Sequence, residues 1–409
     1  MEEIYMKKAF VYKAKGAVAL ALAMSMFCPQ VFAAEALSAE QQGVQAAPVK
    51  ELTEEEIAAQ QLPVLSYEEA LAKAKKNSAD LRDFDELIDV LYEERKDLRD
   101  DIGSLKQEKY EYQKWIDFSE WLDQAKIFAS NTEMKSAYLQ RDLQNLALEI
   151  GVKSSFVDIL GQQDQIRLAQ MNADMQQKLY EQAQVKHRLG MLSTYGTGGL
   201  DEKRIAAEQA KNNLALAEAQ LEQTYTNFNR LLGENAEERY ELVYDVTYEP
   251  YEMQQTMSQY INDKLNNDDL TIKLMELSVE AAKFTTNLLP DEVVAGVSDP
   301  YEKDDRNNYD WDSAKRSLKT AKQQKEDKIQ NAYLQIKQLE TMRASAEADL
   351  KKAETTYRMV EVNYQAGNVT KTAVEQAEMG VINAQNALKT NAYNHDMLVF
   401  TFENPSLLQ

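Results

Sequence analysis

The sequence predicts an all-α protein in which duplicated long helical hairpins form an elongated coiled-coil α-barrel, with little or no β-structure. Three observations support this class. The 409 residues include only 13 Gly and 7 Pro, and Ala, Gln, Glu, Lys and Leu dominate instead, as is typical of long helices. Apolar residues recur every three or four positions over very long stretches. The second half of the chain also repeats the pattern of the first.

Residues 1–33 form a predicted signal peptide. Four lysines precede the apolar run at residues 16–27, which is too short to span a bilayer, and small residues precede a cleavage point after Ala33. A retained anchor is the alternative, which the cleavage point disfavours. We therefore expect an exported protein of the cell envelope, in the outer membrane or the extracytoplasmic space.

Cys28, the only cysteine, lies inside the predicted signal peptide. We therefore expect a mature chain with no disulfide, no thiolate nucleophile and no cysteine metal site. The formal net charge is −22, which disfavours binding to nucleic acid and to anionic membranes but is compatible with neutral or cationic cargo. We expect no nucleic-acid partner.

Residues 34–62 are rich in Ala, Gln and Glu and are predicted to be a flexible lead-in. The first repeat, residues 63–233, begins near Ser66, an N-cap candidate with Glu69 three residues later. From there to Gly190 the pattern is helical, and about 60 residues of it would make a rod of roughly 90 Å. Such a helix is stable only if a neighbour packs along its length.

The neighbour follows after a turn. Gly190 is placed to take a left-handed backbone conformation that ends the rod, and residues 194–199 form a predicted loop. A new apolar stripe then runs from Ala207 to Leu231, and Gly233 ends it. Two long helices joined by a short turn form a hairpin.

Residues 234–262 are the predicted linker between the repeats, and residues 263–409 the second repeat. Within the linker, alternating residues predict one short strand before Pro250; they are Tyr240, Leu242, Tyr244, Val246 and Tyr248. The second repeat is predicted to hold a helix that breaks at Pro290, a loop over residues 290–312, and a long helix from about residue 311 to residue 365.

The duplication follows from three matches in the same order. Residues 75–81 match residues 264–270, the turn at residues 189–193 matches that at residues 366–370, and the apolar stripe after each turn uses small residues. Any two coiled coils can be aligned, which is the alternative explanation, but the shared order favours a repeat. A flat row of four long helices cannot bury both faces, so we expect closure into a cyclic oligomer.

At this point the chain resembles the TolC-like outer-membrane efflux protein family. Residues 65–71 and 76–81 are similar to the opening pattern of that family. The motifs Leu231-Leu232-Gly233 and Leu288-Leu289-Pro290 are similar to those at which its helices end. The resemblance covers about residues 64–403. It implies a homotrimer whose helices form a hollow conduit for efflux or secretion, working with an adaptor (membrane fusion) protein and an inner-membrane transporter. The implied adaptor-docking tip turns contain Arg188, Gly190, Ser193, Gly367 and Thr370.

The chain also departs from the family. In the family each repeat contributes membrane strands at the end opposite the tips, and such strands need about 9–11 residues of alternating apolar character. Here residues 95–128 read as helix and residues 290–312 as loop, so we expect an atypical member without these strands. The three tryptophans, Trp115, Trp121 and Trp311, all fall at this end. They are either membrane-interface aromatics or an aromatic plug that packs the helix ends together.

We find no catalytic, cofactor-binding or metal-ligating constellation in the sequence. His187 and His395 stand alone, residues 196–199 follow a helix rather than a strand, and residues 299–305 lack the spacing of a calcium loop. We therefore predict a non-enzyme without a cofactor. Two functions compete: an export duct component, and a non-conducting coiled-coil structural or binding scaffold of the cell envelope.

Overall fold

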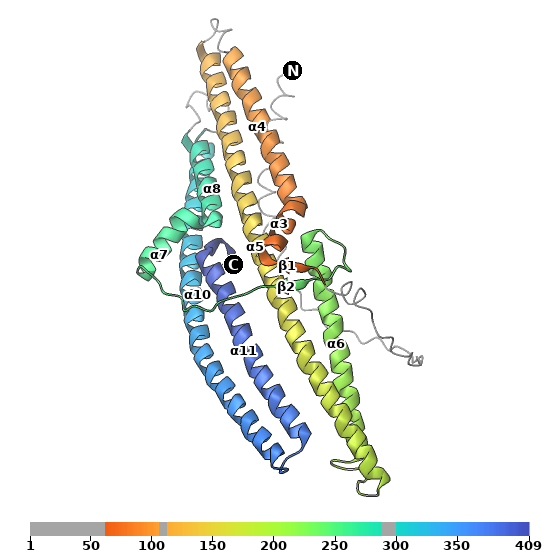
Figure 1. Ribbon diagram of the computed structural model, residues 1–409. Coiled ribbons are helices and arrows are strands. Elements are labelled where there is room, and N and C mark those ends of the chain that lie inside the picture. Colours follow the sequence, from red (N-terminus) through yellow and green to blue (C-terminus); the bar gives the residue numbers. More distant parts are fainter. Residues whose placement is uncertain (1–61, 106–112, 288–299, 409) are drawn as a thin grey trace. The chain divides into compact units, whose positions relative to one another are not determined.

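The computed structural model describes residues 62–105, 113–287 and 300–408, which belong to one structural unit, Gln61–Gln409 (Figure 1). The predicted signal peptide and nearly all of the lead-in lie outside the described residues. Helices dominate the described part and its two strands have three residues each, so the all-α class is confirmed. No helix of that part is long and apolar enough to cross a bilayer.

The first half of the chain forms one long hairpin with a shorter helix pair at its upper end. Its elements are β1 (Val64–Ser66), α3 (Tyr67–Asn77), α4 (Ala79–Leu105), α5 (Gln113–Arg188) and α6 (Leu200–Leu232). The predicted capping box starts α3, because the Ser66 hydroxyl accepts a hydrogen bond from the Glu69 N–H and the Glu69 carboxylate accepts one from the Ser66 N–H.

The second half follows the same order of helices. Its elements are β2 (Glu241–Val243), α7 (Met257–Asp263), the π-helix η1 (Lys264–Asp268), α8 (Leu270–Asn287), α10 (Pro300–Gln365), α11 (Lys371–Glu403) and the 3₁₀ turn η2 (Pro405–Leu407). Thr256 and Gln259 form a capping box at the start of α7, just as Ser66 and Glu69 do for α3. The return helices α6 and α11 have 33 residues each, which supports the duplication.

Each half has a joint where a short helix turns into the helix that runs to the upper end. Ser78 and Asp269 occupy the two joints with extended backbone, and each side chain accepts a hydrogen bond from an N–H of the following helix. The structure thus aligns Ala79 with Leu270. The predicted match of residues 75–81 with 264–270 is therefore two positions out of register here. Between its N-cap and its joint the second half has one residue more than the first, and the wider turn of the π-helix accommodates it.

Three glycines end long helices with the same pair of backbone hydrogen bonds. Gly190, Gly233 and Gly367 all have φ near +70°, and in each case the glycine N–H and the next N–H reach back to carbonyls of the last turn. This is the Schellman arrangement, which needs a left-handed residue that glycine adopts at low cost. The predicted left-handed conformation of Gly190 is confirmed.

Gly233→Ala is expected to lower the free energy of unfolding by about 2–3 kcal/mol. An added Cβ would lie 2.6 Å from Cβ of Asn77 in a backbone conformation with φ +69°, and the Asn77 amide donates to the Leu232 carbonyl at 2.6 Å. Gly367→Ala, which is open to solvent, should cost only about 1 kcal/mol. Gly161→Ala, in a helix with free space, should be neutral or stabilising. Urea denaturation of the three variants tests this order; equal losses would contradict it.

The predicted short strand before Pro250 is confirmed as β2, which pairs in parallel with β1. It has only three residues, so it is shorter than the alternating stretch, and one predicted boundary is wrong. The loop predicted for residues 290–312 is helical from Pro300 onward, since proline is well tolerated in the first turn of a helix; residues 288–299 lie outside the described part. The helical prediction for residues 95–128 is confirmed except at residues 106–112, which are also outside it.

The four longest segments pack side by side in the order α6, α5, α11, α10 (Figure 1). In the described part of the chain, α6 and α10 make no extended contact with each other, so they are the two edges of this row. The main cores lie near the middle of the molecule. One cluster joins β1, α3, α5, α6 and β2, and another joins α7, α8, α10 and α11.

Candidate functional site

The first tip turn is longer than the second and is held by its own hydrogen bonds. Leu200 N–H donates to the Ser193 carbonyl at 3.1 Å, and Gly198 N–H donates to the Glu202 carboxylate at 2.5 Å. The predicted docking residue Ser193 also accepts from the Tyr195 N–H. The inserted residues 194–199 therefore form an ordered protruding loop, as the sequence predicted for a loop at this position.

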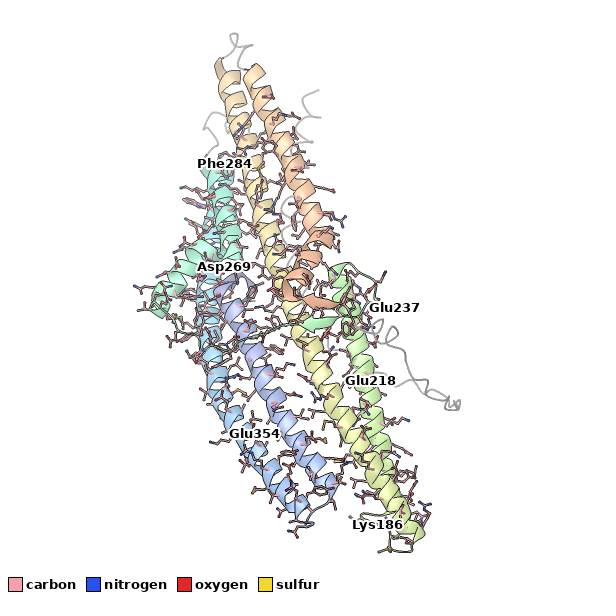
Figure 2. All side chains as sticks on the ribbon, in the orientation of Figure 1. Lys186, Glu218, Glu237, Asp269, Phe284 and Glu354 are labelled. Atoms are coloured by element: carbon pink, nitrogen blue, oxygen red, sulfur yellow. The ribbon has the colours of Figure 1, made fainter. Side chains whose placement is uncertain are left out.

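The first tip exposes large apolar side chains next to positive charge. Leu189, Met191 and Tyr195 are 67%, 74% and 78% exposed. The last turn of α5 ends in Lys186, His187 and Arg188, and Figure 2 shows Lys186 at this end of the molecule. An exposed apolar group of this kind on an ordered loop is typical of an interaction surface. Arg188 is among the docking residues predicted from the sequence, whereas the three apolar residues are not, although they lie close to Gly190 in sequence.

The second tip turn is short and closes directly into the next helix. Gly367 has φ +77° and Thr370 is the N-cap of α11, without a side-chain capping bond. In the described part, no hydrogen bond or ion pair joins a residue of the first tip turn to a residue of the second. The expected docking residues thus form two separate turns, which an ion pair between α5 and α11 links: the Lys178 ammonium lies 2.8 Å from the Glu375 carboxylate.

Three ion pairs of this type join the two hairpins along α5 and α11. Their N–O distances are between 2.8 and 2.9 Å; the pairs are Lys153 with Asp396, Asp164 with Lys389, and Lys178 with Glu375. The sign of charge on α5 alternates from one pair to the next. Like charges face each other if one helix slides to the next pair, so the row fixes the register of the two hairpins.

The uppermost of these pairs is the most buried. Lys153 is 9% exposed and its ammonium lies 4.7 Å from the Phe400 ring centre. The Tyr244 hydroxyl donates to the same Asp396 carboxylate at 2.5 Å, and burial, followed by this hydrogen bond to a carboxylate, raises the pKa of Tyr244. Tyr244 therefore stays a neutral donor, and the linker is tied to both hairpins.

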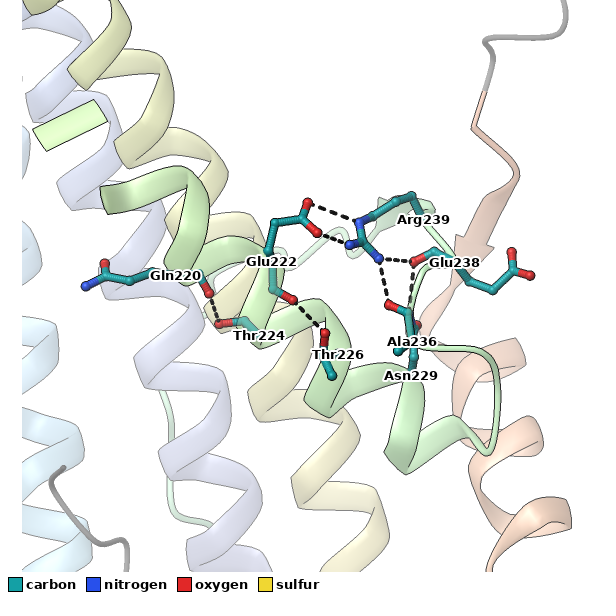
Figure 3. A network of polar contacts seen from close by, with 8 residues as sticks. All are labelled: Gln220, Glu222, Thr224, Thr226, Asn229, Ala236, Glu238 and Arg239. Atoms are coloured by element: carbon teal, nitrogen blue, oxygen red, sulfur yellow. Dashed lines mark hydrogen bonds and ion pairs between the residues drawn. The ribbon is translucent and has the colours of Figure 1, made fainter. Parts of the chain in front are cut away.

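A second polar network fixes the loop after α6. The Arg239 guanidinium pairs with the Glu222 carboxylate and donates to the carbonyls of Ala236 and Glu238 at 3.0 and 2.7 Å, and the buried Asn229 amide donates to the same two carbonyls (Figure 3). Every contact in this network is internal to the loop and α6. It is a rigid element of the fold, and we find no ligand chemistry in it.

The predicted interface tryptophans lie in helices at the end opposite the tips. Trp115 and Trp121 fall in α5, and their side chains are outside the described part. Trp311 lies in α10, half-buried, with the Lys315 ammonium 3.7 Å from its ring centre. Toward the same end, the ring of Phe128 on α5 stacks on the ring of Phe284 on α8, with their centres 3.8 Å apart; Phe284 is labelled in Figure 2.

In the part of the chain that the structure describes, no group of three or more His, Cys, Asp or Glu side chains is placed to hold a metal ion. His187 donates a hydrogen bond from its Nδ1–H to the Leu192 carbonyl at 2.9 Å, and His395 is buried beside Tyr248. Each histidine thus has a contact within the chain that accounts for its position.

Paired long hairpins with glycine turns at one end, repeated within one chain, are the architecture that the resemblance to TolC-like outer-membrane channels predicted. Solved structures bear this out. CusC matches with a TM-score of 0.60 at 13% identity, over 83% of this chain and 91% of that one. VceC of Vibrio cholerae, an outer membrane protein, matches with a TM-score of 0.56 at 11% identity, over 83% and 96%.

The CmeC outer membrane channel of Campylobacter jejuni matches with a TM-score of 0.58 at 12% identity, over 93% of this chain and 95% of that one. No family model and no curated protein sequence matches the chain. At these identities the similarity concerns the fold, and the predicted resemblance to TolC-like channels is confirmed at that level. These neighbours are channel proteins rather than enzymes.

Proposed function

We propose that the chain is a component of a TolC-like export duct: a homotrimer whose hairpins close into a helical conduit for efflux or secretion across the cell envelope. The observation that carries this proposal is the row α6, α5, α11, α10, in which each of the two edge helices has a long-helix neighbour on one side only within the described part. A single row leaves edges and two faces open, and cyclic closure pairs the edges and encloses one face. The shared fold with outer-membrane channels supports the same reading.

The tip turns are the proposed docking sites for an adaptor protein that links the conduit to an inner-membrane transporter. Arg188, Gly190 and Ser193 lie in the first turn and Gly367 and Thr370 in the second, and both turns have a fixed backbone. The exposed apolar loop of the first tip gives that turn the larger contact surface. The tryptophans at the opposite end are proposed to lie near a membrane surface, with the protein exported to the outer membrane or the extracytoplasmic space.

Two measurements on the full chain test this proposal. Light scattering of the purified protein should give the mass of three copies, and host cells that lack the protein should retain a fluorescent efflux substrate. Complementation with Tyr195→Glu should restore efflux poorly, because a charge replaces an exposed docking ring, whereas Glu237→Gln, in an exposed loop away from the tips (Figure 2), should restore it fully. A monomer or a two-chain coiled coil, with unchanged efflux in cells lacking the protein, would instead support the envelope scaffold.

A further inference from the structure

The two edge helices of the row expose large apolar side chains. On α6, Ile205 and Leu216 are 46% and 60% exposed, and on α10, Met359 and Val362 are 56% and 65% exposed. Residues three or eleven positions apart lie on the same face of a helix, so each helix has an exposed apolar face in addition to the one that packs inside its own hairpin. Two such faces on opposite edges fit a head-to-tail contact between identical chains.

Charged residues beside these faces are arranged in complementary order. Counted upward from the tips, α6 presents positive, negative and positive groups at positions three or four apart: Arg204, Glu208 and Lys211. In the same direction α10 presents negative, positive and negative groups: Glu361, Arg358 and Glu354, the last of which is labelled in Figure 2. Each set lies on one flank of its helix.

Within one chain these groups pair only along their own helix. Arg204 lies 3.0 Å from Glu208, and Arg358 lies 3.7 Å from Glu354. All four side chains are at least 40% exposed in these pairs, so each charge keeps room for a second partner.

Contacts inside the chain set the relative height of the two edges. Three polar contacts connect the four helices in turn: Gln163 with Tyr225, Lys178 with Glu375, and Asn391 with Leu339. Neighbouring helices in the row are antiparallel and have the same rise per residue. One contact between two helices therefore shows which residue of the second helix lies at the height of any residue of the first.

Carried across the row in this way, Lys211 comes level with Glu354. By the same count, Glu208 and Ile205 come within one residue of the levels of Arg358 and Met359. In a ring, rotation about the axis preserves height, so residues that are level within one chain remain level across the contact between neighbouring chains. The two charged sets therefore face each other with opposite signs at every position.

We propose that the seam between neighbouring copies is formed by α6 of one chain against α10 of the next, with Arg204, Glu208 and Lys211 opposite Glu361, Arg358 and Glu354. The occupant of each edge is a second copy of this chain. The inference rests on the proposed function, since it requires a closed ring. Apolar contacts supply the association, while exposed ion pairs add little affinity and select partner and register.

Disulfide trapping tests the seam directly. In full chains with Cys28→Ser, which removes the only cysteine, the pair Ile205→Cys and Met359→Cys should give linked dimers and trimers on mild oxidation. The control pair Ile205→Cys and Leu334→Cys uses another exposed residue of α10, roughly 37 Å further along the helix, and should give none. A trimer by light scattering without linkage of residues 205 and 359 overturns the seam and leaves the conduit standing. A monomer overturns both.

Charge reversal tests the ion pairs. Glu208→Arg alone and Arg358→Glu alone should each raise the trimer dissociation constant by roughly tenfold, because three seams each lose an exposed pair. The double variant should return to within about twofold of the original value. Glu378→Arg, an exposed position on α11, is the matched control and should change nothing. Additive losses in the double variant would contradict the pairing.

Discussion

Phe156→Ala is expected to lower the free energy of unfolding by about 3–5 kcal/mol. Phe156 has no exposed surface and lies at the centre of the first core cluster. Its ring makes edge-on contacts with Tyr67, Phe228 and Tyr244 at centroid distances of 6.1, 5.5 and 5.9 Å. The substitution removes the buried area and these aromatic contacts together.

Urea denaturation followed by circular dichroism measures this loss, at a fixed protein concentration because association stabilises the folded chain. Val185→Ala is the matched control, since Val185 lies on the same helix and is 46% exposed; its loss should stay below about 0.5 kcal/mol. A loss under about 1 kcal/mol for Phe156→Ala would show that this cluster does not hold the two strands, α3 and α6 to α5.

Asp269→Ala is expected to cost about 3–5 kcal/mol, because it leaves a buried cation without its counter-charge. Asp269 is fully buried, and one carboxylate oxygen accepts hydrogen bonds from the N–H groups of Thr271 and Ile272. The other oxygen lies 3.6 Å from the Lys325 ammonium, which also donates to the carbonyls of Pro405 and Leu408. Burial lowers the pKa of Lys325, and the charge of Asp269 opposes that change.

Two further variants separate the contributions. Asp269→Asn keeps an acceptor for the helix cap but removes the charge, so its loss should fall between those of Asp269→Ala and the original protein. Asp269→Ala combined with Lys325→Met should recover part of the loss. Ser78→Ala removes the cap at the equivalent joint, where no ion pair is recorded, and should cost only about 1 kcal/mol. Equal losses at the two joints would contradict a role for the ion pair.

The sequence was sufficient to predict the elements that depend on local signals. Ser66 and Glu69 start α3 as expected, because a capping box needs only residues three apart. Gly190 ends α5 as expected, because few other residues tolerate its left-handed backbone. The duplication was visible for the same reason, since each half repeats its own caps and turns.

Features set by distant residues could not be predicted in the same way. The ion pairs between α5 and α11 join residues about two hundred positions apart, and nothing local distinguishes Lys153 or Lys178 from other lysines on a solvated helix face. The alternating tyrosines after Tyr240 indicated a strand, but Tyr244 and Tyr248 pack instead against Tyr393 and His395 of α11. Alternating apolar residues indicate that one side of an extended segment is buried, but either a sheet or packed helices can bury it.

The exposed loop at the first tip was placed correctly but its character was missed. The glycines of residues 194–199 indicate a loop, but no local signal indicates that Leu189, Met191 and Tyr195 are exposed. Only the structure shows that all three point into solvent on an ordered turn. The docking role of both tips, and the positions of Trp115, Trp121 and Trp311 relative to a membrane, stay predictions.

The five-residue π-helix at Lys264–Asp268 has a consequence for the history and the engineering of the chain. In an α-helix, one inserted residue rotates everything beyond it by roughly 100°, which would turn the buried face of α8 out to solvent. The wider turn takes up the extra residue before the chain reaches the extended joint at Asp269. The segments between N-cap and joint can therefore differ in length by one residue in the two halves while the following helix still packs on its neighbours. At this turn the two repeats tolerate a difference in length.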